Sequence, residues 1–157
     1  MKKKINIEIE VYKSIDELVN MEQELVLKAK SIAKQAYAPH SKFYVGAALL
    51  LDNGEIVSGN NQENAAYPSG ICAERTAIFY ANAQYPKQSI KTLAVAVFTK
   101  GEYAEQPVTP CGSCRQVMLE AENRYNVPMR VIMIGEKQIY VVNSVKDLLP
   151  LSFGSIK

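Results

Sequence analysis

The sequence predicts an α/β fold in which helices cover both faces of one sheet. Apolar segments of strand length alternate along the chain with segments of helical spacing, which is the pattern of α/β proteins. The segments 45–51 and 93–99 are almost continuously apolar, as strands are when both faces of their sheet are covered. The length of 157 residues suits one domain with a sizeable core.

The first predicted elements are a strand and a long helix. Residues 5–12 alternate apolar with polar side chains, which predicts a strand with one buried face, either an extra edge strand or an ordered arm at a subunit contact. Ser14, with Glu17 three positions later, has the pattern of a helix N-cap. Apolar residues within 18–36 follow helical spacing, and this helix is expected to end before Pro39.

The rest of the chain is predicted to alternate strands with helices, because turn residues separate its apolar runs from its segments of helical spacing. Asp52-Asn53-Gly54 is the clearest turn signal and predicts a hairpin. The predicted elements are a loop at 38–43, hairpin strands at 45–51 and 55–60, a polar loop at 61–70, a helix at 72–85, a buried strand at 93–99, a surface loop at 101–109, a helix at 111–125, strands at 130–134 and 138–142, and a short helix at 144–149.

Composition and charge argue against several classes of protein. The net charge of +2 is too small to indicate a nucleic-acid footprint or a membrane-binding surface, so neither partner is expected. No apolar run approaches the roughly 20 residues that span a bilayer, and the start of the chain lacks the apolar core of a signal peptide. Cysteines that need no disulfide fit the reducing cytoplasm, where we expect the protein to act.

All three cysteines belong to two short motifs, Cys72-Ala73-Glu74-Arg75 and Pro110-Cys111-Gly112-Ser113-Cys114-Arg115. Catalytic zinc sites use three protein ligands and leave the fourth position for water, and three thiolates meet that requirement. Both motifs are expected to begin helices, whose positive ends favour thiolates. Glu74 lies two positions after the first cysteine, where its carboxylate can face the open side of the metal and act as general acid and base.

The charge of this predicted metal site needs compensation. Three thiolates on one divalent ion leave a net negative charge, which would weaken the ion as a Lewis acid. Arg75 and Arg115 each directly follow a key residue, and both can donate hydrogen bonds to sulfur. Arg75 is the stronger candidate, because its neighbour Glu74 already faces the site.

Three longer motifs resemble cytidine deaminase in its short, homotetrameric form with three cysteine ligands. They are Asn61-Gln62-Glu63-Asn64-Ala65-Ala66-Tyr67, Cys72-Ala73-Glu74-Arg75-Thr76-Ala77 and Pro110-Cys111-Gly112-Ser113-Cys114-Arg115-Gln116. The resemblance extends over residues 29–153 and includes the stretches 41–48 and 148–150. Together the motifs are highly specific, whereas each alone is not.

The resemblance implies a fold, a reaction and an assembly. The fold would be a three-layer α/β/α sandwich with a mixed five-stranded sheet, in a single domain over 1–157 whose residues 1–28 are partly an extension. The reaction would be the hydrolytic deamination of cytidine and 2′-deoxycytidine to the uridines with release of ammonia, as in pyrimidine salvage. Each chain would hold one zinc ion, in a homotetramer whose neighbouring subunits complete each site.

The resemblance also implies roles for individual residues. The metal site would consist of the zinc ligands Cys72, Cys111 and Cys114, the proton shuttle Glu74, and the supporting Arg75 and Arg115. The substrate site would consist of Phe43 against the pyrimidine ring, Asn61 and Glu63 at the ribose, Ala73, and Tyr67 and Phe153 reaching the site or its rim from neighbouring subunits.

Several alternatives remain open from the residues alone. The only histidine, His40, stands where the family often has Tyr, and it could instead complete a structural zinc site as a fourth ligand. Cys111 and Cys114 could form a redox pair, although Cys72 would then be unexplained.

Other functions to weigh are a related deaminase for a cytosine-nucleoside antibiotic or modified base, a polynucleotide-editing enzyme and a non-catalytic zinc scaffold. Plainer roles also exist for the other site residues, namely a helix-start charge for Glu74, a solvated charge for Arg75, packing for Phe43 and Phe153, and turn chemistry for Asn61 and Glu63.

Overall fold

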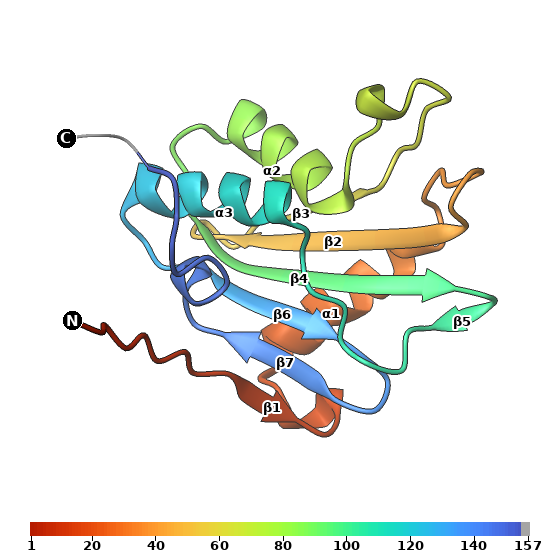
Figure 1. Ribbon diagram of the computed structural model, residues 1–157. Coiled ribbons are helices and arrows are strands. Elements are labelled where there is room, and N and C mark those ends of the chain that lie inside the picture. The colour runs from red at the N-terminus through yellow and green to blue at the C-terminus, as the bar shows by residue number, and fades with distance from the viewer. Residues whose placement is uncertain (155–157) are drawn as a thin grey trace.

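Three α-helices enclose a β-sheet from both sides, which gives the three predicted layers (Figure 1). The computed structural model describes residues 1–154. Helix α1 (Asn20–Ala33) covers one face of the sheet, and helices α2 (Ala73–Gln84) and α3 (Gly112–Tyr125) lie side by side on the other. No helix within residues 1–154 combines the length and the apolar character that crossing a membrane requires.

The sheet is mixed, as predicted, but it has seven strands and not five. Its order is β1-β7-β6-β4-β2-β3, with β5 paired to β4; only β4 and β6 run parallel. The two members beyond the five that the resemblance implies are β1, which confirms an extra edge strand within the predicted segment 5–12, and β5, in which two residues of the predicted loop fold back and place Tyr103 against the ring of Phe98. The strands are β1 (Glu10–Tyr12), β2 (Phe43–Leu51), β3 (Ile56–Asn60), β4 (Ile90–Thr99), β5 (Glu102–Tyr103), β6 (Arg130–Ile134) and β7 (Ile139–Val142).

Two hydrophobic cores lie on opposite faces of the sheet, and strand β4 contributes to both. Leu93 and Val95 point into the core beneath α2 and α3, whereas Ala94 and Ala96 point into the core beneath α1. All four are buried, which confirms the prediction from the continuous apolar run at 93–99. Small side chains on the α1 side let that helix approach the sheet closely.

Two glycines set how closely the helices approach the sheet. A Cβ atom added at Gly46 in β2 would lie 2.1 Å from the Ala29 carbonyl oxygen of α1. One added at Gly59 in β3 would lie 2.7 Å from the Ala77 backbone nitrogen of α2. Any larger residue would therefore push a helix away from the sheet, and Gly59 in particular fixes the helix that carries the first cysteine motif.

The N-terminal region differs most from the prediction. The predicted strand 5–12 pairs with β7 only at Glu10–Tyr12, and residues 5–9 continue without a partner. The predicted helix is interrupted, since a 3-10 turn, η1 (Ile15–Glu17), precedes α1 and Val19 between them is extended. Ser14 precedes that turn, and the Glu17 carboxylate accepts a hydrogen bond from the Lys13 backbone, so these polar residues end up at a short turn. Burial of Leu18 in the core beneath α1 accompanies the break.

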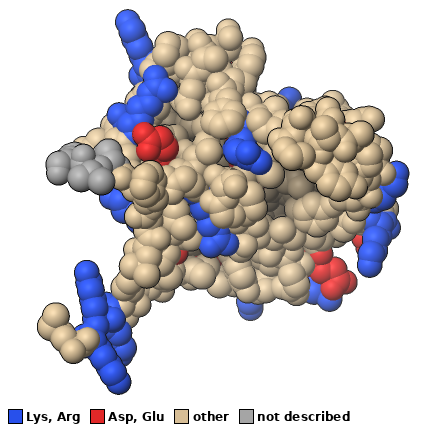
Figure 2. Space-filling view, turned by 45° about the horizontal axis from the view of Figure 1, so that its top comes forward, with Lys and Arg blue, Asp and Glu red and all other residues tan. Residues whose placement is uncertain are grey.

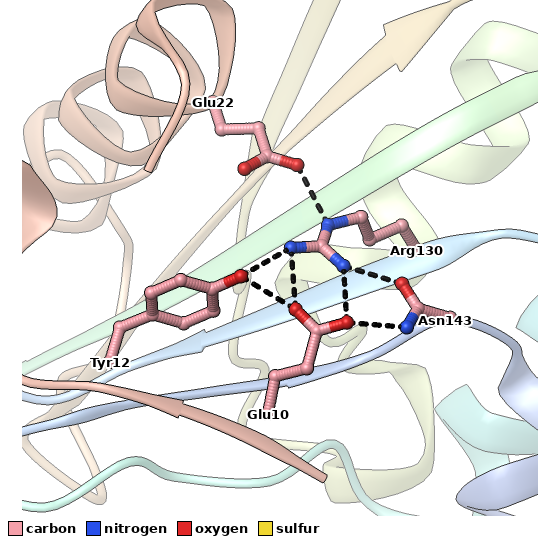
Figure 3. A network of polar contacts seen from close by, with 5 residues as sticks. All are labelled: Glu10, Tyr12, Glu22, Arg130 and Asn143. Atoms are coloured by element: carbon pink, nitrogen blue, oxygen red, sulfur yellow. Dashed lines mark hydrogen bonds and ion pairs between the residues drawn. The ribbon is translucent and has the colours of Figure 1, made fainter. Parts of the chain in front are cut away.

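A polar network fastens strand β1 to the rest of the molecule (Figure 3). The Arg130 guanidinium donates to both oxygens of Glu10, at 3.1 and 3.0 Å, and to Glu22 of α1 at 2.7 Å. Tyr12 and Asn143 also donate to Glu10, so each Glu10 oxygen accepts two hydrogen bonds. These donors, Arg130 first, lower the pKa of Glu10 to about 2. We call these five residues the edge network.

The remaining predicted elements are confirmed with small changes of boundary. The hairpin forms at Asp52-Asn53-Gly54, where Gly54 adopts a positive φ of 87°. The predicted short helix at 144–149 is a single 3-10 turn, η3 (Val145–Asp147), with Ser144 as its N-cap. A further 3-10 turn, η2 (Tyr67–Ser69), lies in the polar loop before α2.

Candidate active site

The three cysteines meet at the N-termini of α2 and α3. Cys72 is the N-cap of α2, Cys111 is the N-cap of α3, and Cys114 lies in the first turn of α3. Their sulfur atoms all lie within 4.8 Å of one another. The predicted meeting of the two motifs is therefore confirmed, and the arrangement follows from two neighbouring helices that begin at the same edge of the sheet.

The thiols perturb one another strongly. Hydrogen bonds from Cys114 and Arg75 lower the pKa of Cys72 to about 5. The pKa of Cys114 is raised in turn, because its sulfur hydrogen-bonds to Cys72 and is buried. Three thiols this close cannot all ionise without a cation between them, whereas a soft divalent ion would take all three as thiolates. The donor set thus fits zinc and leaves room for a non-protein fourth ligand.

Glu74 supplies a buried carboxyl group beside the cysteines. It lies in the first turn of α2, lines the same pocket as Cys72 and Cys111, and is only 4% exposed. Burial, more than any other cause, raises the pKa of its carboxyl group. A carboxyl group with a raised pKa can both accept and return a proton near neutral pH.

The two arginines beside the motifs act differently from each other. Arg75 donates from Nη2 to the Cys72 sulfur at 3.3 Å, as predicted, and its buried Nε has no hydrogen-bond partner within residues 1–154. Arg115 was expected to reach a sulfur as well, but its guanidinium donates to oxygens of Pro110, Leu148 and Thr109. Arg115 therefore braces the turn that carries Cys111 against the C-terminal segment.

The pocket above the cysteines has an apolar side and a polar side. Phe43 and Val45 of β2 and Val95 and Val97 of β4 line the apolar side. The polar side comes from the loop 61–70 and the loop before β2. A flat aromatic ring fits the first surface, and hydroxyl groups fit the second.

Asn61 and Glu63 line the polar side and are already held by the protein. The Asn61 amide accepts from the Val45 backbone at 2.7 Å and donates to the Phe43 carbonyl at 2.9 Å, so it fixes the end of β2. The Glu63 carboxylate accepts from the His40 backbone at 2.8 Å and from the Ser41 backbone and hydroxyl. The Ser41 hydroxyl is the largest cause of the lowered pKa of Glu63.

Among the residues of the pocket wall that sequence reasoning did not assign to the site are Ser41 and His40. Ser41 lies in the 41–48 stretch that carries the resemblance, and its position two residues before Phe43 was the available signal. His40, expected to be an ordinary loop residue, packs edge-on against Tyr67 with ring centroids 5.7 Å apart. Tyr67 itself lines the pocket of its own chain.

Two predicted substrate-binding residues lie outside the wall of this pocket. Ala73 is fully buried at the start of α2, between Cys72 and Glu74. Phe153 is 81% exposed, and its carbonyl accepts a hydrogen bond from Gln116 at 3.1 Å. The side chain of Phe153 therefore faces solvent in the isolated chain.

Comparison with known proteins places these features in a family. The family model for the cytidine and deoxycytidylate deaminase zinc-binding region matches residues 19–129. A cytidine deaminase of Sporosarcina psychrophila is 44% identical over 131 residues, which are 83% of this chain and 90% of that protein. The crystal structure of cytidine deaminase from Burkholderia pseudomallei is 38% identical, has a TM-score of 0.71, and matches 83% of this chain and 97% of its own. That of Mycobacterium tuberculosis is 31% identical with a TM-score of 0.67, over 85% and 98% of the two chains.

Proposed function

This chain belongs to the cytidine and deoxycytidylate deaminase family, and we propose that it converts cytidine and 2′-deoxycytidine to uridine and 2′-deoxyuridine by hydrolysis. One water is consumed and one ammonia is released for each nucleoside. The observation that carries the proposal is the cluster of three thiols, two of which, Cys72 and Cys111, line one pocket with the buried Glu74. The relatives named above, which are cytidine deaminases, make pyrimidine nucleosides the first substrates to test.

Cys72, Cys111 and Cys114 would hold one zinc ion per chain. When bound, zinc supplies a Lewis acid that lowers the pKa of water to about 7. Arg75 stabilises the Cys72 thiolate through its hydrogen bond to sulfur and offsets part of the negative charge of the thiolates. Arg115 keeps the second motif in place from behind.

Glu74 would move the protons of the reaction. Its carboxylate accepts a proton from the attacking water and delivers it to N3 of the pyrimidine while oxygen adds at C4. It then takes the proton of the new C4 hydroxyl and gives it to the C4 amine, so that the C4–N bond breaks, the C4 carbonyl forms and ammonia leaves. The burial that raises its pKa supports both roles, since the group must hold a proton and release it in the same cycle.

The other pocket residues would orient the nucleoside. Phe43 packs against the pyrimidine ring, and Asn61 and Glu63 bind ribose hydroxyls with the hydrogen-bonding capacity that the protein leaves them. Ala73 contributes backbone contacts next to the metal. Tyr67 and Phe153 would complete a neighbouring site in a homotetramer, a role that the high exposure of both side chains supports.

The wider setting is also part of the proposal. The chain would act as one domain in the cytoplasm, where its three free thiols stay reduced, and would serve pyrimidine salvage. The pocket suits a small-molecule nucleoside rather than a nucleic acid, because the net charge of +2 provides little attraction for a polynucleotide backbone.

One preparation of the protein can test the proposal. Zinc per chain is measured, and the absorbance of cytidine, deoxycytidine and free cytosine is followed with the wild type and with Glu74→Ala. We expect one zinc per chain in both proteins and conversion of both nucleosides by the wild type alone. Zinc bound without any conversion would contradict the proposed reaction and favour a zinc scaffold. Conversion of free cytosine as fast as cytidine would contradict the ribose contacts.

A further inference from the structure

The first nine residues form an extended arm that projects from the body of the molecule (Figures 1 and 2). Three apolar side chains of the arm, Ile5, Ile7 and Ile9, remain 45, 47 and 48% exposed. Their alternation with polar residues is that of a strand with one apolar face, yet none of the three belongs to either hydrophobic core among the described residues. The arm therefore has the sequence pattern of a half-buried strand, but its apolar side chains stay largely exposed.

The arm continues an edge strand that is firmly held. Strand β1 pairs with β7 on one side only and ends the sheet on the other. The edge network holds Glu10 and Tyr12 through Arg130, so the base of the arm has a fixed direction (Figure 3). An edge strand with unpaired backbone groups is a template on which another strand can pair.

The charges of the arm have no ion-pair partners among residues 1–154. Lys2, Lys3, Lys4 and Glu8 take part in none of the ion pairs found within residues 1–154. Figure 2 shows basic side chains gathered near the end of the arm. The arm thus carries a basic tip and, near its base, the acidic Glu8, and two antiparallel copies of it would bring opposite charges together.

We propose that residues 2–10 pair antiparallel with the same residues of a second copy of this chain, about a two-fold axis at Asn6. In this register Lys4 of each copy lies opposite Glu8 of the other, and Ile5 lies opposite Ile7. At the ends of the paired segment Lys2 lies opposite Glu10, and Lys3 lies opposite Ile9. Directly opposed residues share one face of an antiparallel pair, so the isoleucines form one stripe that ends in Lys3, and the remaining charged residues lie on the other face with Asn6. Every contact occurs twice because of the two-fold symmetry.

Other registers satisfy the charges less well. A shift of the axis by half a residue would place isoleucines opposite polar residues along the whole arm. An axis at Ile7 would leave Glu8 opposite Asn6 and would direct Lys4 to Glu10. The axis at Asn6 also places Lys2 opposite Glu10, so the feature that favours it is the partner that it gives to Glu8, which takes part in no ion pair among the described residues.

A second copy is a better occupant than the far edge of the sheet. Strand β3 forms the opposite edge of the sheet, and pairing of the arm with it would be a head-to-tail contact between chains. Unless such contacts closed into a ring, one arm and one β3 edge would stay unpaired at the ends of the assembly. Pairing of arm with arm closes after two chains. This inference does not depend on the proposed reaction, because the arm lies outside the pocket.

Disulfide trapping tests the axis directly. Asn6→Cys in the full-length, zinc-loaded protein would place two thiols directly opposite each other, and mild oxidation should give a covalent dimer on a non-reducing denaturing gel. Asn53→Cys, at the exposed hairpin turn, measures random collision, and the wild type measures any contribution of the three native cysteines. We expect at least about tenfold more dimer from Asn6→Cys than from Asn53→Cys, since directly opposed Cβ atoms lie about 5 Å apart. Equal yields at the two positions would overturn the proposal.

A charge exchange tests the register independently. Both changes are made in the Asn6→Cys protein. Lys4→Glu places an acidic residue at position 4 opposite Glu8 of the other copy, at both symmetric contacts. Glu8→Lys places a lysine opposite Lys4 at the same two contacts. Each single change should reduce the rate of disulfide trapping about three- to tenfold, because like charges directly opposite each other disfavour strand pairing. The double variant restores both attractions and should recover the original rate. A double variant as slow as the singles would overturn this register.

Discussion

The pocket and the edge network each contain a carboxyl group beside an arginine, but the pKa values of the two carboxyl groups are shifted in opposite directions. Glu74, 4% exposed in the pocket, has a raised pKa because burial disfavours its charged form. Glu10, whose side chain is 30% exposed, has its pKa lowered to about 2 by donors from Arg130, Tyr12 and Asn143. The sign of each shift therefore follows from a balance, in which burial outweighs the donated hydrogen bonds at Glu74 and the donated hydrogen bonds outweigh burial at Glu10.

The arginines differ in the same way as the carboxyl groups. In the edge network the Arg130 side chain donates to four neighbours, namely Glu10, Tyr12, Glu22 and Asn143. In the pocket Arg75 donates to one sulfur and leaves its buried Nε without a partner among the described residues. A network with every group paired suits attachment of a strand. A site with unpaired groups keeps capacity for a metal and a substrate.

The same substitution at the two carboxyl groups should have opposite consequences. Glu74→Gln removes the proton shuttle, and we expect kcat to fall by about 10²–10⁴-fold, since a general acid–base group contributes that much. The free energy of unfolding of the Glu74→Gln protein should stay the same or rise, because a buried ionisable group is replaced by a neutral one. Glu10→Gln should leave kcat unchanged and lower stability. Steady-state kinetics and urea unfolding of both variants measure this; equal kinetic losses in both would contradict the contrast.

Removing the arginine of the edge network should have the largest effect on stability. Arg130→Leu leaves Glu10 and Glu22 facing each other without their cation, and we expect the free energy of unfolding to fall by about 3 kcal/mol, as charged hydrogen bonds contribute about 1.5–3 kcal/mol each. Lys137→Leu is the matched control, because its pair with Glu105 is more than half exposed on both sides and should contribute little. Urea unfolding compares the two; similar losses would mean that Arg130 acts only as a surface charge.

The pocket was more predictable from the sequence than the edge network, for a physical reason. The cysteine motifs are local, since Cys72 and Glu74 share one helix turn and Cys111 and Cys114 share another. Only the meeting of the two helices had to be inferred, and it followed from the α/β pattern and from the need for three thiolates to share one ion. The edge network instead joins Glu10 to Arg130, 120 positions away, and no local pattern marks such a pair.

The errors in the predicted fold have related causes. Ser14 and Glu17 have the pattern of a helix cap, but burial of Leu18 in the core beneath α1 separates their turn from the helix. The alternation at 5–12 predicts a strand, yet alternation does not say whether the partner strand is in the same chain. Arg115 adjoins a cysteine in sequence, but the direction of its side chain is set by carbonyl groups of Pro110 and Leu148.

Within the pocket, the attachment of Glu63 offers a smaller test of the same contrast. Ser41→Ala removes the hydroxyl that holds the Glu63 carboxylate, and we expect KM for cytidine to rise roughly fivefold with little change in kcat, since a charged hydrogen bond in an exposed site is partly screened. Ser41→Thr keeps a hydroxyl and should restore most of the affinity. Kinetics with cytidine measure both. A loss confined to kcat would mean that Ser41 does not act through substrate binding.

The smallest expected effect is the pH dependence of the Glu10 contribution. Because the pKa of Glu10 falls from 4.5 unfolded to about 2 folded, its stabilisation is complete above pH 4.5 and is lost as the pH falls toward 2. The partly exposed position limits this contribution to about 1 kcal/mol at neutral pH. The difference in unfolding free energy between wild type and Glu10→Gln, both metal-free so that zinc release cannot interfere, should therefore shrink steadily from pH 5 to pH 3. A difference that stayed constant would assign the stabilisation to packing of β1 on β7 and not to the charge of Glu10.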